Sequence, residues 1–139
     1  MTSSSSGKPL AEKLGIRPNM RIATLNTPSG YDSLLGTLPP GVDIANELEE
    51  PCEIIHAFYV LRGALQEDFP RLKLALADSG GLWISWPKTT SNVETDLNEN
   101  VVREVGLAHG LVDVKVAAVD ATWSALKFVR RLKDRPAAL

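Results

Sequence analysis

Residues 72–88 read LKLALADSGGLWISWPK, and this stretch decides the fold. Leucines at helical spacing in its first half predict the end of an amphipathic helix. Ser-Gly-Gly at 79–81 predicts the turn that ends this helix, and the apolar run 82–86 predicts a short strand that stops at Pro87. A helix that leads directly into a strand is a unit of an α/β sheet, and Lys88 then lies at the end of the strand, where such sheets bind ligands.

Composition predicts one globular domain without a general affinity for polyanions. The chain has 139 residues, of which 44% are hydrophobic and 23% charged, and its formal net charge is −2. No apolar run approaches the ~20 residues of a membrane span, so we expect no membrane partner. Residues 1–8 are rich in serine, and we expect a disordered tail there and a single domain over 9–135. The one cysteine, Cys52, fits a reducing compartment, so we expect a cytoplasmic protein.

The first half of the domain predicts short elements followed by one buried strand. Proline and glycine positions bound a helical segment over 9–14, a strand over 21–25, a short helix over 31–36 and a second strand over 42–45. The run 53–60 is nearly all apolar, which is typical of a parallel strand covered on both faces.

The second half predicts two longer helices and a terminal hairpin. The elements are helices over 61–76 and 97–108 and antiparallel strands over 111–119 and 123–131. The apolar phase of the first helix continues past Pro70, where we expect a kink or two abutting segments in register. Asp96, with Glu99 three residues later, is typical of a capping box at the start of the second helix.

This alternation of strands and helices predicts a three-layer α/β fold with a mainly parallel sheet and a C-terminal antiparallel hairpin. One connection leaves two alternatives open. The link 46–52 is shorter than the dozen residues that a parallel crossover normally takes. Either this link runs extended beneath the sheet, or the strand over 42–45 is antiparallel.

The order of helix, Ser-Gly-Gly, apolar strand, helix and hairpin over 54–130 resembles the C-terminal half of class I S-adenosylmethionine-dependent methyltransferases. The whole chain is similar to a family of small bacterial proteins known as a domain of unknown function (number 3052). The matching segments are Leu14-Gly15-Ile16, Trp86-Pro87-Lys88, and Trp123-Ser124 ahead of Lys127-Phe128-Val129. Together these resemblances imply a Rossmann-like, methyltransferase-like fold, and the small family implies no particular activity.

The chain departs from the methyltransferase pattern where the cofactor would lie. Such enzymes carry a glycine-rich loop after the first strand, because only glycine lets the backbone approach the cofactor closely. Here the loop 26–30 has one glycine and a proline, and Glu47 stands in for the acid that would hold the ribose. The next strand and helix are missing from the link 46–52. We therefore expect an incomplete cofactor pocket and no bound cofactor.

Polar and aromatic side chains gather at the ends of the predicted strands. Arg62 and Lys88 would supply a pair of cations there, Asp120 an acid, and the indoles Trp86 and Trp123 apolar walls. The full candidate set is Asn26, Thr27, Ser29, Gly30, Tyr31, Arg62, Trp86, Lys88, Asp120, Trp123 and Ser124. This set suits a small anionic or nucleotide ligand. The competing interpretation is that both tryptophans belong to the core and that Lys88 is solvated.

A serine hydrolase and a metal site are both disfavoured. Ser29, Ser124, His56, His109 and Asp120 supply the residue types of a triad, but the sequence has no Gly-x-Ser-x-Gly elbow. We expect His56 to be a hydrogen-bonded core histidine, because it lies in a buried strand. Two separated histidines and one cysteine lack the spacing of metal ligands, so we predict no metal and no catalytic residues.

The sequence favours binding over catalysis. Our leading hypothesis is a non-catalytic protein that binds a small anionic or nucleotide ligand, or a protein partner. The alternative is an atypical methyltransferase acting on a small molecule, with Glu47 and the loop 26–31 holding S-adenosylmethionine. A third hypothesis is an interaction protein with Trp123 and the hairpin at a homodimer interface. The basic stretch 127–135 is interpreted as a solvated last strand and tail whose charges oppose edge pairing, so nucleic acid is not an expected partner.

Overall fold

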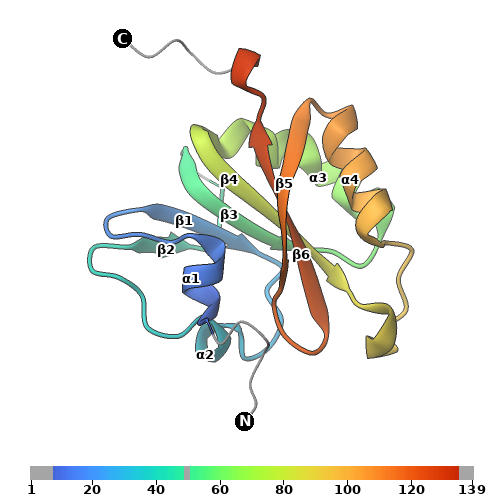
Figure 1. Ribbon diagram of the computed structural model, residues 1–139, viewed down its shortest axis with the longest axis horizontal. Coiled ribbons are helices and arrows are strands. Elements are labelled where there is room, and N and C mark those ends of the chain that lie inside the picture. Colours follow the sequence, from blue (N-terminus) through green and yellow to red (C-terminus); the bar gives the residue numbers. More distant parts are fainter. Residues whose placement is uncertain (1–7, 49–50, 135–139) are drawn as a thin grey trace.

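The computed structural model describes residues 8–48 and 51–134, which form a six-stranded sheet with helices on both faces (Figure 1). The strands are β1 (Arg21–Leu25), β2 (Asp43–Ala45), β3 (Cys52–Phe58), β4 (Leu76–Pro87), β5 (Leu111–Ala118) and β6 (Trp123–Arg130), in the order β2-β1-β3-β4-β6-β5. The helices are α1 (Leu10–Leu14), α2 (Tyr31–Leu35), α3 (Arg62–Ala75) and α4 (Glu99–Ala108), with 3-10 turns η1 (Thr89–Ser91) and η2 (Leu132–Asp134). The predicted mainly parallel α/β fold with a terminal hairpin is confirmed.

Each face of the sheet has its own apolar core. Helices α1 and α2 cover one face, and α3 and α4 cover the other (Figure 1). Alternate residues of β3 enter the two cores, with Ile54 and Phe58 on the α1–α2 side and Ile55 and Ala57 on the α3–α4 side. Burial of both faces is the reason that β3 is a continuous apolar run.

The direction of β2 is now settled, because it runs parallel to β1 with Arg21 opposite Asp43. Strand β3 is parallel to β1 on its other side. The antiparallel alternative is therefore wrong. All three residues of β2 are exposed, so the crossover to β3 does not need a helix to cover a buried face.

The Ser-Gly-Gly segment lies inside a strand and does not form the turn that we predicted. Helix α3 continues through Pro70 to Ala75, and β4 begins at once at Leu76. The register of β4 against β3 then shifts before Gly81. A Cβ atom at Gly80 would lie 2.9 Å from the carbonyl oxygen of Glu53. Glycine is therefore needed here because two strands approach closely at an irregularity.

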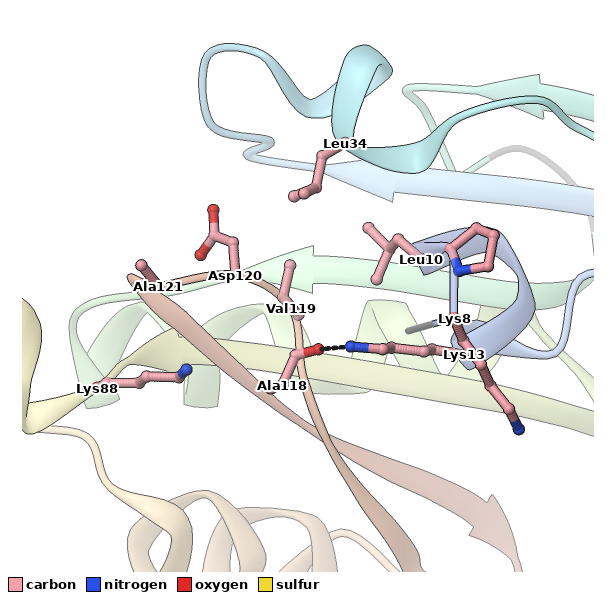
Figure 2. Close-up of a pocket in the computed structure, with 10 residues that line it drawn as sticks. Lys8, Leu10, Lys13, Leu34, Lys88, Ala118, Val119, Asp120 and Ala121 are labelled. Atoms are coloured by element: carbon pink, nitrogen blue, oxygen red, sulfur yellow. Dashed lines mark hydrogen bonds between the residues drawn. The ribbon is translucent and has the colours of Figure 1, made fainter. Parts of the chain in front are cut away.

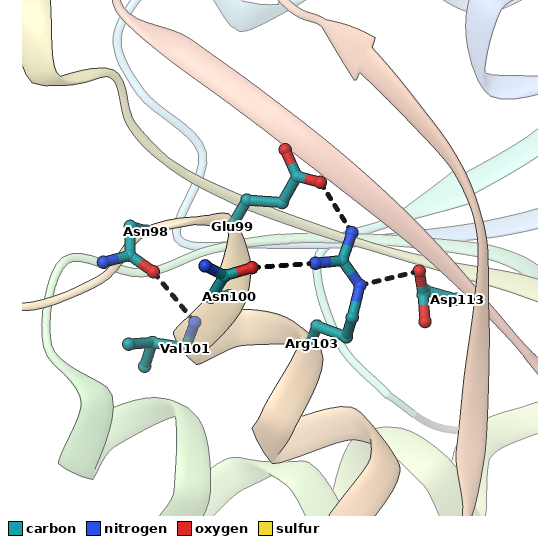
Figure 3. Close-up of polar contacts among 6 residues, drawn as sticks. All are labelled: Asn98, Glu99, Asn100, Val101, Arg103 and Asp113. Carbon is teal, nitrogen blue, oxygen red and sulfur yellow. Dashed lines mark hydrogen bonds and ion pairs between the residues drawn. The ribbon is translucent and has the colours of Figure 1, made fainter.

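Helix α4 is capped by a different residue from the one that we predicted. The Oδ1 atom of Asn98 accepts a hydrogen bond from the backbone N–H of Val101 at 2.9 Å (Figure 3). Asp96 lies two residues further from the helix, and its Oδ1 instead accepts from the backbone N–H of Arg62 at 2.7 Å. Asp96 thus connects the entry to α4 with the first turn of α3.

Arg103 joins α4 to the sheet. Its Nε atom donates to Asp113 on β5 at 2.9 Å, and its Nη2 donates to Glu99 at 2.6 Å (Figure 3). Both acids raise the pKa of the Arg103 guanidinium, mainly through these hydrogen bonds.

The last strand is an interior strand. β6 lies between β4 and β5, so the prediction that its basic residues protect a sheet edge is wrong. Arg130 has a structural role, since its Nη2 donates to the carbonyl oxygens of Lys73 at 2.7 Å and Leu76 at 2.8 Å. These bonds tie β6 to the end of α3 and to the first residue of β4.

Among the described residues, no helix is both long and apolar enough to cross a membrane. The predicted disordered tail over 1–8 lies outside the described residues except for Lys8, and so does residue 135 of the predicted domain.

Candidate functional site

The carboxyl ends of five strands lie along one edge of the sheet, and β2 is one of them because it is parallel to β1. β1, β3 and β4 are parallel, and β5 shares the direction of β4 because both are antiparallel to β6. The loops that follow these strands therefore share this edge. The chain leaves β1 toward β2 on one side and reaches β3 on the other, which makes the space between β1 and β3 the topological switch point.

The edge is hollowed at that switch point. The cavity there, which we call the β1–β3 hollow, has a volume of about 290 Å³. It is lined by Asn26, Phe58, Tyr59, Val60, Leu61, Ala64 and Trp123. Trp123 packs edge-on against Phe58 with ring centroids 5.0 Å apart. The hollow therefore offers a largely apolar, aromatic surface with one amide at its rim.

Asn26 fixes the geometry of the β1–β3 hollow. It ends β1 in the left-handed conformation, with a φ of 57°. Its Nδ2 donates to the carbonyl oxygen of Phe58 at 3.1 Å, which ties the end of β1 to the end of β3. Asparagine tolerates the left-handed conformation better than most residues, so one side chain serves both the turn and the bond.

A second, larger cavity lies between α1, α2 and the β5–β6 turn (Figure 2). This lysine cleft has a volume of about 570 Å³ and is lined by Lys8, Pro9, Leu10, Lys13, Leu34, Lys88, Ala118, Val119, Asp120 and Ala121. Lys13 Nζ donates to the carbonyl oxygen of Ala118 at 3.1 Å. Lys88 extends into the cleft, and its ammonium group has no hydrogen-bond or ion-pair partner within the part of the chain that the structure describes.

The predicted cation pair is not formed. Arg62 begins α3 on the opposite face of the sheet, where its Nη2 lies 3.7 Å from a carboxylate oxygen of Glu104 on α4. Lys88 lies on the α1–α2 face. The two cations are therefore separated because the first turn of α3 faces α4 and not the loop after β4.

Tyr31, predicted as a ligand residue, belongs to a buried relay. Its hydroxyl lies 2.8 Å from His56 Nδ1, and His56 Nε2 lies 2.7 Å from Ser85 Oγ. His56 and Ser85 are fully buried, so His56 is the hydrogen-bonded core histidine that we expected. Burial lowers the pKa of His56 to about 3, and burial with the charge of Asp32 raises the pKa of Tyr31. The relay is neutral at physiological pH and joins α2, β3 and β4.

Comparison with known proteins shows which solved structures share this fold. No family model and no curated protein matches the chain. Solved structures do match. An S-adenosylmethionine-dependent methyltransferase from Aquifex aeolicus has a TM-score of 0.60 and 12% identity, over 86% of each chain. This chain has a methyltransferase-like Rossmann fold.

Two further structures have the same methyltransferase-like fold. The pyocyanin biosynthetic protein PhzM has a TM-score of 0.65 and 10% identity, over 91% of this chain and 56% of that one. Magnesium protoporphyrin IX methyltransferase from Synechocystis PCC 6803, solved with bound SAH, has a TM-score of 0.56 and 13% identity, over 82% of this chain and 75% of that one. At these identities the likeness concerns the fold. The resemblance to the small bacterial family stays a prediction.

The loop after β1 suits the cofactor of methyltransferase-like folds in part. Gly30 has a φ of 83°, and a Cβ built there would meet no other atom within 4 Å, so the backbone is open to close approach. Thr27 and Ser29 are exposed beside it. Glu47 is exposed two residues after β2, at the same edge, because β2 is parallel to β1. The accessible backbone at Gly30 and an acid are thus present, but the other glycines of a glycine-rich cofactor loop are absent from residues 26–30.

The remaining candidates have mainly structural positions. Trp86 is 5% exposed and packs in the α3–α4 core, which agrees with the core interpretation. Ser124 is partly buried on β6 opposite Trp86. Asp120 lines the lysine cleft, and its Oδ1 also accepts from the backbone N–H groups of Thr122 and Trp123, each at 2.8 Å. The carboxylate of Asp120 therefore stabilises the β5–β6 turn through these two hydrogen bonds.

The triad residues do not meet. His109 stacks on Phe69 with ring centroids 4.7 Å apart, and its Nδ1 lies 2.8 Å from the carbonyl oxygen of Val105. Both ring nitrogens of His56 are already hydrogen-bonded, to Tyr31 and to Ser85.

Our sequence analysis missed most of the walls of the β1–β3 hollow. Tyr59 lies at a predicted strand end but was not among the predicted site residues, although its hydroxyl donates to Asp68 at 2.7 Å and burial, followed by this bond, raises its pKa. The one signal available was Leu61, an apolar residue just past a buried strand, which the structure leaves 57% exposed at the rim of the hollow.

Proposed function

We propose that this chain binds S-adenosylmethionine at the carboxyl edge of its sheet and methylates a small molecule. The observation that carries the proposal is the β1–β3 hollow, which opens at the switch point of a methyltransferase-like sheet. Ligands of open α/β sheets bind at that place, and apolar walls with a few polar groups are typical of small-molecule sites.

Residues at the carboxyl edge of the sheet would support different parts of the ligand. Gly30 offers an accessible backbone, and Glu47 is an acid that can accept hydrogen bonds from ribose hydroxyl groups. Phe58 and Trp123 provide aromatic surface for an apolar or planar group, and the Asn26 amide stands at the rim.

When bound, S-adenosylmethionine supplies an activated methyl group. The contribution of this chain is to hold and orient the methyl acceptor and to exclude water from the space between the methyl group and the acceptor. The aromatic walls of the β1–β3 hollow suit both roles, because transfer between two fixed groups depends chiefly on proximity and alignment.

Ala64 provides a direct test. It is an exposed residue in the first turn of α3 that lines the hollow, so Ala64→Phe fills the hollow without disturbing the core. Gln66→Phe is the matched control, because it adds the same side chain to an exposed position of α3 that does not line the hollow. Calorimetry with S-adenosylmethionine should show binding to the native protein and to Gln66→Phe, and binding at least about tenfold weaker to Ala64→Phe. No heat with the native protein, or equal affinities for all three, would overturn the proposal.

A second candidate is the non-catalytic binding of a small anionic ligand, which the lysine cleft favours. Three lysines and one acid line that cleft, and the acid is held in a turn. Lys88 has no partner among the described residues, so an anion there would supply one. Adenosine monophosphate should then bind with lower affinity to Lys88→Met, while S-adenosylmethionine gives no heat. Light scattering of the same samples tests the proposed homodimer.

A further inference from the structure

Lys127 lies in an unusual environment on β6. It is directly opposite Lys115 on β5, so two like charges face each other across the hairpin. Its stem passes over Gly81, where an added Cβ would lie 2.5 Å from Lys127 Cε. Its Nζ lies 5.9 Å from the centroid of the Trp83 ring. The stem of Lys127 therefore lies against the sheet, and the side chain lines a cavity there.

This cavity lies away from the carboxyl edge of the sheet. The α1–β6 cleft has a volume of about 400 Å³ and is lined by Glu12, Gly15, Ile16, Arg17, Met20, Glu53, Ile54, Ser79, Gly81 and Lys127. Glu53 and Ile54 are at the amino end of β3, and Gly15 ends α1. This cleft is thus separate from the β1–β3 hollow and shares no lining residue with the lysine cleft.

Within the part of the chain that the structure describes, Lys127 has no direct counter-ion in the α1–β6 cleft, which two acids and two cations line. Burial, followed by the charges of Lys115 and Arg17, lowers the pKa of Lys127. No ion pair or hydrogen bond of its ammonium group occurs among the described residues. Two acids also line the cleft, but neither forms an ion pair with Lys127: Glu53 Oε1 accepts from the backbone N–H of Arg21 at 2.6 Å, and Glu12 is exposed on α1. A half-buried cation with two like-charged neighbours is stabilised by an anion.

We propose that the α1–β6 cleft binds a phosphate or carboxylate group of a small molecule between Lys127 and Arg17. The anion would relieve the repulsion among the three cations and form charge-assisted hydrogen bonds with both lining side chains. The exposed Ser79, which lines the same cleft, has a hydroxyl group to donate to it. This site is independent of the proposed methyltransferase function, because it lies at the amino end of β3, whereas the β1–β3 hollow lies at the carboxyl end.

The test is a titration of the full chain with inorganic phosphate and, separately, with citrate, followed by amide chemical shifts. Lys127→Met removes the charge and keeps an apolar stem over Trp83. Lys133→Met removes an exposed lysine of η2 outside the cleft, and Lys88→Met removes the lysine of the other cleft. We expect binding by one of the two anions that weakens at least about tenfold in Lys127→Met and is unchanged in the control Lys133→Met, while Lys88→Met reports anion binding at the lysine cleft. Phosphate alone or citrate alone as the ligand identifies the preferred group.

Three results would overturn the proposal. They are no binding of either anion to the native chain, equal weakening in Lys127→Met and Lys133→Met, and weakening in Lys88→Met alone. The affinity for S-adenosylmethionine, measured on Lys127→Met, should equal that of the native chain. A failure of the anion site and a failure of the proposed methyltransferase are therefore seen in different measurements.

Discussion

Replacing His56 by glutamine should make the protein less stable at neutral pH and less sensitive to mild acid. His56 bridges Tyr31 and Ser85, and all three side chains are buried. Glutamine can satisfy one of the two hydroxyl groups at best. The other is left buried without its partner, which costs about 1–3 kcal/mol of unfolding free energy.

The acid sensitivity follows from the difference in proton binding between the two states. The pKa of His56 is about 3 in the folded protein, against 6.5 for an unperturbed histidine. Above pH 6.5 the histidine is neutral in both states, and its stabilising contacts are fully present. Below that pH the unfolded chain takes up a proton that the folded chain does not, so stability falls by up to about 1.4 kcal/mol per pH unit.

Urea unfolding of both proteins at several values between about pH 5 and pH 6.5 measures this difference. His109 and the carboxylates are common to both, so they cancel in the comparison. The free energy of unfolding of the native protein should fall more steeply on acidification than that of His56→Gln, by about 1 kcal/mol per pH unit. Identical slopes would show that the pKa of His56 is the same in the folded and unfolded states, and the argument from burial would be wrong.

Three further substitutions test the packing. Gly106→Ala should destabilise by about 1–3 kcal/mol in urea unfolding, because its Cβ would lie 2.0 Å from Phe128 Cε1; an unchanged midpoint would contradict this contact. Asn98→Ala should cost about 1 kcal/mol through loss of the α4 cap, whereas Asn98→Asp should cost much less, as checked by helical circular dichroism during melting. Lys88→Ala should change stability by less than about 0.5 kcal/mol, since its ammonium group has no partner among the described residues; a larger drop in melting temperature would place Lys88 in the structural framework.

The elements of this fold were predictable wherever local pattern and burial agree. The strand over 21–25 and the hairpin strands were found because turn residues bound their apolar segments. Helix α3 was found across Pro70 because its apolar phase is unbroken. The common edge of the four loops followed from the predicted parallel direction of their strands.

Long-range geometry was not predictable in the same way. Gly80 looks like a turn residue in sequence, and only the approach of Glu53 from β3 shows why it is glycine. Arg62 and Lys88 follow neighbouring strands, but the side of the sheet that each faces depends on how α3 packs on α4. The site at Lys127 had no local signal, since Lys115 and Arg17 come from other elements.

The interior position of β6 has a consequence for how the chain is made. Until residues 123–130 leave the ribosome, β4 has no partner on one side and β5 has none at all. A nascent chain that ends before Trp123 therefore presents unpaired backbone groups and the uncovered side chains of both cores, which are the features that lead to aggregation. We expect a fragment truncated at this point to be recovered from inclusion bodies, and the intact sheet to be completed only after synthesis has passed Arg130.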